Sequence, residues 1–81
     1  MKEKKIIVDI LSQITGLDSS DFLDNPELSL IDDGILDSLS TVYFIHEASK
    51  AFNKSFSIQN FNLEDFQTVD CLVEAITAKL S

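Results

Sequence analysis

The chain has 81 residues, of which 44% are hydrophobic, and a formal net charge of −8 at pH 7. This length predicts one domain spanning residues 1–81, with enough apolar content for a compact core. The acidic charge argues against nucleic-acid binding, because phosphate contacts need a basic surface. A lone cysteine, Cys71, excludes an internal disulfide and a cysteine-based metal cluster.

The charges are unevenly distributed along the chain. Residues 6–49 contain acids but no lysine or arginine. A solvated acidic surface and a docking surface for a basic protein both explain this pattern. The N-terminus leads into an amphipathic pattern and not into a signal-peptide core, which favours the cytoplasm and predicts no membrane insertion.

The first predicted helix covers residues 3–15. Its apolar residues fall at helical spacing and form one stripe: Ile6, Ile7, Ile10, Leu11 and Ile14. Gly16 is a suitable C-terminal cap. The long connection over 17–36 contains scattered apolar residues, so we expect it to pack onto the core, with a short helical turn at 19–23 and a tight turn at Asp33-Gly34.

The second predicted helix covers residues 38–52, begins at Asp37 or Ser38 and stops at Asn53. Its core stripe consists of Thr41, Phe44, Ile45, Ala48 and Phe52. A second stripe beside it contains Leu39, Val42 and His46. The helix is therefore apolar over more of its surface than its own core requires, which predicts a contact surface for a partner.

The remaining segments predict an extended loop over 54–61, a helical turn over 62–66 and a last helix capped by Thr68. The apolar stripe of that last helix consists of Val69, Leu72, Val73, Ile76 and Leu80. The predicted fold is all-α: a small four-helix bundle of three main helices and one short helix, with a long loop between helices 1 and 2.

Ser38 is the main candidate site residue, since a turn delivers it to the start of a helix. There, backbone N–H groups lack helical partners and the helix dipole favours negative charge, so a phosphate ester on the serine would be stabilised. Taken alone, Asp37-Ser38-Leu39 is first of all a helix cap. Both roles are compatible, with Asp37 as the cap and Ser38 as the modified residue.

The segment Asp33-Gly34-Ile35-Leu36-Asp37-Ser38-Leu39 resembles the D-x-G-x-x-D-S-[LM] signature of acyl and peptidyl carrier proteins. The order of helices and loops is similar to that family over essentially the whole chain. Residues 61–68 also resemble the F-x-x-E-[DN]-[WF]-x-T pattern of D-alanyl carrier proteins.

The resemblance implies a covalent 4′-phosphopantetheine arm on Ser38, attached by a phosphopantetheinyl transferase. An adenylating ligase would then load an acyl or aminoacyl group as a thioester, and a downstream acceptor or transferase would receive it. Asp37, Leu39, Val42 and His46 would face these partners. The second helix contains only Glu47 as an acid, unlike carriers of fatty-acid synthesis, which favours an aminoacyl or specialised acyl cargo. The resemblance thus implies a D-alanyl carrier or a standalone peptidyl carrier.

No acid–base pair or nucleophile–base set is evident, so we expect a carrier without catalytic activity of its own. We also expect it to be a monomer and to hold no metal. The alternative is a small acidic adaptor that binds a partner through Leu39, Val42 and His46 without a prosthetic group. His46 is alone and is interpreted as a surface residue. Cys71 is interpreted as a partly buried structural thiol.

Overall fold

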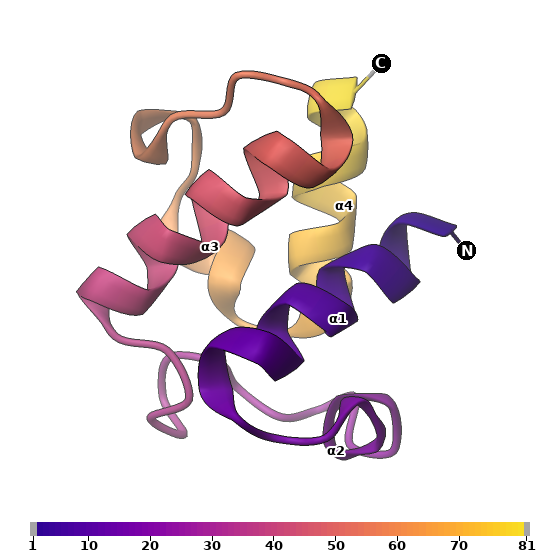
Figure 1. Cartoon of the computed structure of the whole chain (residues 1–81). Helices are drawn as coiled ribbons and strands as arrows, with labels where there is room; N and C mark the ends of the chain where they lie inside the picture. Colours follow the sequence, from indigo (N-terminus) through magenta and orange to yellow (C-terminus); the bar gives the residue numbers. More distant parts are fainter. Residues whose placement is uncertain (1, 81) are drawn as a thin grey trace.

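The computed structural model describes residues 2–80 and contains three long α-helices, one short α-helix and two 3₁₀ turns (Figure 1). In chain order they are α1 (Lys2–Thr15), α2 (Ser19–Leu23), α3 (Ser38–Phe52), η1 (Ile58–Asn60), η2 (Leu63–Phe66) and α4 (Val69–Leu80). Residues 2–80 contain no strand. The all-α prediction, with three main helices and a long loop after the first, is confirmed.

The core lies where α1 packs against both α3 and α4. From α1, Ile7, Ile10 and Leu11 are buried as predicted, while Ile6 and Ile14 are only partly buried at its edge. Val8 is also buried, outside the predicted stripe, because α2 packs against α1. Gly16 ends the helix with φ of +79° and donates to the carbonyl of Ser12, so the predicted cap is confirmed.

The long connection between α1 and α3 packs onto the core, as the sequence predicts. It includes α2, and its apolar anchors Phe22 and Leu30 are 1% and 0% exposed. The Leu30 amide donates to the carbonyl of Gln67 at 2.9 Å, which ties the connection to the segment before α4. These contacts hold the connection on the core, although it contains only the short helix α2.

Helices α3 and α4 bury the predicted stripes over most of their length. Thr41, Phe44, Ile45 and Ala48 are buried on α3, and Val69, Leu72, Val73 and Ile76 are buried on α4. Phe52 and Leu80, at the C-terminal ends of these helices, are only partly buried. Thr68 accepts the Cys71 amide at 3.2 Å, which confirms it as the N-cap of α4. The Cys71 side chain is partly exposed, as expected.

The segment over 54–61 is not extended throughout, so this part of the prediction is wrong. Residues 58–60 form the 3₁₀ turn η1. Side chains stabilise the turn locally, because Ser57 accepts the Gln59 amide and Asn60 accepts the Ser57 amide. The predicted helical turn over 62–66 is a second 3₁₀ turn, η2. Together η1 and η2 carry the chain across α3 toward α4 (Figure 1).

Within residues 2–80, none of the helices is both long and apolar enough to cross a membrane.

Candidate functional site

The start of α3 is capped by Asp37, which resolves whether Asp37 or Ser38 begins the helix. The Asp37 carboxylate accepts the Ser40 amide at 2.8 Å, and the Asp37 carbonyl accepts the Thr41 amide at 2.9 Å. Ser38 is therefore the first residue of the helix, and its side chain is exposed. The cap leaves the serine hydroxyl available for another role.

The Ser40 amide also affects the charge of Asp37. Its hydrogen bond stabilises the carboxylate and lowers the pKa of Asp37 below the ordinary value of 3.8. Asp37 is thus a fixed negative charge beside Ser38 at neutral pH. A basic partner surface would meet this charge together with the exposed acids of the preceding loop, Asp32 and Asp33.

A tight turn sets the approach of the chain to Ser38. Gly34 adopts φ of +74° and its amide donates to the carbonyl of Ile31 at 3.0 Å, which confirms the predicted turn. A Cβ atom at Gly34 would meet no atom within 4 Å, so the backbone conformation alone favours glycine here. Leu36 then enters the core, with 3% of its surface exposed. Ser38 follows two residues after this anchor.

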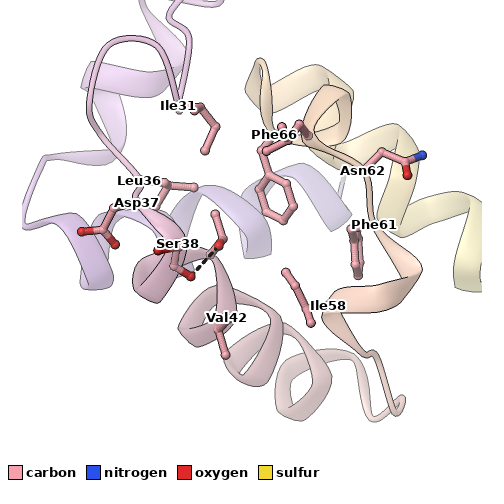
Figure 2. Close-up of a pocket in the computed structure, with 11 residues that line it drawn as sticks. Ile31, Leu36, Asp37, Ser38, Val42, Ile58, Phe61, Asn62 and Phe66 are labelled. Carbon is pink, nitrogen blue, oxygen red and sulfur yellow. Dashed lines mark hydrogen bonds between the residues drawn. The ribbon is translucent and has the colours of Figure 1, made fainter.

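A groove opens directly beside Ser38, between α3 and the η1–η2 segment (Figure 2). Its volume is about 370 Å³. The lining residues are mostly apolar: Ile31, Leu36, Asp37, Ser38, Thr41, Val42, Ile58, Phe61, Asn62, Leu63 and Phe66. The polar side chains of the lining contribute little to the interior surface of the groove. The Thr41 hydroxyl donates to the Ser38 carbonyl at 2.8 Å, and the Asn62 amide points away from the groove in Figure 2.

A model of the family described as "Phosphopantetheine attachment site" matches residues 5–76 of the chain. The chain belongs to the phosphopantetheine-bearing carrier proteins. It is 37% identical over 76 residues to the D-alanyl carrier protein of Lactobacillus delbrueckii subsp. bulgaricus, covering 94% of this chain and 91% of the relative. It is 34% identical to that of Streptococcus equi subsp. zooepidemicus, covering 94% and 92%, and 31% identical to that of Streptococcus gordonii, covering 95% and 94%.

The comparisons confirm the predicted resemblance and favour the carrier over the adaptor without a prosthetic group. The prosthetic group of the carrier is 4′-phosphopantetheine. The start of α3 fits this group, because it combines an exposed serine hydroxyl with a helix N-terminus that favours a phosphate diester. When bound, the group supplies a thiol that holds cargo as a thioester.

The predicted partner-facing residues of the carrier all lie at the surface, but only some of them line the groove. Leu39 is 78% exposed, Val42 is 50% exposed and His46 is exposed. Val42 lines the groove, as does Asp37, while Leu39 and His46 lie outside it. The predicted stripe therefore runs from the groove onto the open face of α3.

Sequence reasoning missed the opposite wall of the groove. Ile58 and Leu63, from η1 and η2, are 42% and 72% exposed and line the groove across from Val42. Both lie in turns of three or four residues, which are too short to show a helical period. No group of three or more His, Cys, Asp or Glu side chains in residues 2–80 is arranged to hold a metal ion.

Proposed function

We propose that Ser38 is the residue that carries the 4′-phosphopantetheine arm. A phosphopantetheinyl transferase would join the Ser38 oxygen to the phosphorus that bears the pantetheine, releasing the nucleotide part of coenzyme A and the hydroxyl proton. The observation that supports this assignment is the exposed position of Ser38, at the first turn of α3 and on the rim of the groove. The Asp37 cap holds that turn in place without using the Ser38 hydroxyl.

We further propose that the cargo is D-alanine, because relatives that match 94% of this chain are D-alanyl carrier proteins. An adenylating ligase would activate the amino acid and transfer it to the thiol of the arm. A downstream transferase or acceptor would then take it from the thioester. The carrier itself would contribute no catalytic group, acting in the cytoplasm as a monomeric domain over residues 1–81.

Recognition by these partners would use Asp37 together with Leu39, Val42 and His46. Leu39 and Val42 offer apolar area, and Asp37 offers a charge beside the reacting serine. A small apolar surface rimmed by acids suits weak, repeated docking to several enzymes with basic surfaces. His46 lies farther along the same exposed face of α3.

Intact-mass measurement tests the attachment site. The purified carrier is incubated with coenzyme A, magnesium and a broad-specificity phosphopantetheinyl transferase, and we expect the mass of one arm to be added. Ser38→Ala should abolish the gain. Ser40→Ala is the matched control, since Ser40 lies on the same turn and the substitution keeps the backbone amide that donates to the Asp37 cap.

A mass gain that persists in Ser38→Ala would mean that the arm is attached to another residue. A wild-type protein that gains no mass would contradict the carrier function itself. The cargo is tested separately, by loading the holo carrier with the cognate ligase and a panel of D- and L-amino acids and fatty acids. Preferential loading of D-alanine is expected, and a preference for long-chain acids would refute this assignment.

A further inference from the structure

The groove beside Ser38 ends against an aromatic wall. Phe66 lines the groove and is only 2% exposed. Behind it lies Phe44, which is fully buried and does not line the groove. The two rings make an edge-to-face contact with centroids 6.3 Å apart and planes at 85°. The Phe66 ring thus separates the groove from the centre of the core.

Phe61 extends this wall on the side of η1. Its ring centroid lies 5.8 Å from that of Phe66 and 6.1 Å from that of Phe56. The ammonium of Lys79 lies 4.6 Å from the Phe61 ring centroid, which holds the ring from the side of α4. Figure 2 shows the rings of Phe61 and Phe66 on the side of the groove away from Ser38.

The size of the groove limits what can enter it. Its volume of about 370 Å³ lies near the lower end of the range of about 300–1,000 Å³ for small-molecule pockets. Cargo on an arm attached to Ser38 would enter from the rim, because Ser38 itself lines the groove. An acyl chain that outgrows the groove would have to displace packed aromatic rings, and displacing close-packed side chains is unfavourable.

We propose that Phe66 is a specificity-determining residue that closes the inner end of the groove and limits the length of acyl chain that the carrier can shelter. The inference rests on the proposed attachment of the arm to Ser38. Short acyl groups are sheltered at the mouth, and longer chains extend into solvent. A charged aminoacyl group stays at the rim, where the Asp37 carboxylate lies beside Ser38, because the apolar interior does not stabilise its ammonium. Such a carrier presents its cargo to partner enzymes and does not store it.

Replacing Phe66 tests the proposal. Phe66→Ala removes the ring between the groove and Phe44, and apolar cavities of this kind stay dry and accept apolar ligands. Wild type, Phe66→Ala and Phe52→Ala are loaded with butanoyl, octanoyl or dodecanoyl phosphopantetheine from the matching coenzyme A thioesters. Phe52→Ala is the control, since Phe52 is a half-buried phenylalanine at the far end of α3 and does not line the groove. Intact mass confirms each loaded protein before denaturant unfolding is measured.

In the wild type and in Phe52→Ala, we expect the unfolding equilibrium constant to be the same with octanoyl and dodecanoyl chains. In Phe66→Ala, each further methylene that becomes buried should lower this constant about fourfold. The proposal is overturned if the wild type gains stability with chain length as strongly as Phe66→Ala. It is equally overturned if Phe66→Ala shows no dependence on length, or if Phe52→Ala behaves like Phe66→Ala.

Two further measurements keep the test decisive. If Phe66→Ala does not fold, Phe66→Leu removes less volume and should show the same trend over the shorter chains. The unmodified proteins are also titrated with 1-octanol and followed by methyl NMR shifts of Leu36 and Ile58. Octanol should bind Phe66→Ala at least tenfold more tightly than the wild type, and equal binding would overturn the role of Phe66. This titration needs no arm, so its result is separate from a failure to modify Ser38.

Discussion

The Leu36 amide donates to the carbonyl oxygen of Leu30 at 2.7 Å, and both side chains are buried. This hydrogen bond brings together the two ends of the short loop that precedes Ser38. Gly34 makes the turn within that loop, and Asp37 caps the helix immediately after it. The position of Ser38 therefore depends on three features that follow one another along the chain: the turn at Gly34, the buried side chain of Leu36 and the cap at Asp37.

Replacing Gly34 should affect both stability and modification. Gly34→Ala places a side chain at φ of +74°, where the left-handed conformation costs an L-residue about 1–2 kcal/mol. Gly16→Ala is the matched control, because Gly16 has φ of +79° and also has open space around it. Urea unfolding should show similar losses for both variants. Only Gly34→Ala should also slow the transfer of phosphopantetheine, and an equal effect of Gly16→Ala on that rate would contradict a local role for the turn.

The charge on Asp37 should stabilise the fold in a pH-dependent way. Its pKa is lowered in the folded protein by the hydrogen bond from the Ser40 amide. Its stabilising contribution is therefore fully present above the ordinary pKa of 3.8 that applies to the unfolded chain, and is lost as the pH falls through the lower folded pKa. Asp37→Asn keeps an acceptor but removes the charge. Urea unfolding of both proteins should differ at neutral pH and converge in strong acid, and a difference that persists there would rule out the charge as its source.

Leu30 should be essential for holding the long loop on the core. It is fully buried although it lies outside any helix, and truncating such a leucine typically costs about 2–5 kcal/mol. Leu30→Ala should lower the free energy of unfolding by an amount in this range. Leu23→Ala serves as the comparison, since Leu23 belongs to the same connection but is 52% exposed. Similar losses for the two variants in urea unfolding would mean that the loop is not anchored at Leu30.

Leu39 and Leu63 should contribute to partner binding and not to folding. They are 78% and 72% exposed, so Leu39→Ala and Leu63→Ala should each change stability by no more than about 0.5 kcal/mol. Truncation costs more than about 1 kcal/mol, or roughly fivefold in binding, only at the minority of interface residues that dominate affinity, and we expect Leu39 and Leu63 to be among them. We expect at least this loss in the apparent affinity of the transferase or ligase, measured from initial rates of loading.

Leu23→Ala controls for these two variants as well, because it also removes an exposed leucine, from α2. Its loading rates should match those of the wild type. If Leu63→Ala loads normally while Leu39→Ala does not, the partner surface is confined to α3 and does not cross the groove.

The helices and their caps are determined largely by local sequence. The apolar period of α1, the glycine at its end and the caps at Asp37 and Thr68 are interactions between residues a few positions apart. Such signals can be recognised in the sequence without knowledge of the fold. For the same reason the turn and helix start that present Ser38 could be predicted from the pattern Asp33 to Leu39.

Short elements were harder to predict because polar side chains can outweigh an apolar pattern. The alternation over residues 54–61 is typical of a strand or an extended segment, but the hydrogen bonds of Ser57 and Asn60 wind part of it into η1. The exposure of Leu63 depends on where η2 packs against the rest of the molecule, because a turn of four residues is too short to form separate apolar and polar faces.

The sequence by itself determined a helical carrier with Ser38 at the start of a helix, because a cap, a turn and a signature motif are local features. Only the tertiary structure decided that this serine stands at the rim of an apolar groove with Phe66 at its inner end. That groove exists because the η1–η2 segment packs across α3, and contacts between segments some twenty residues apart in the chain depend on how the whole core packs and not on local pattern.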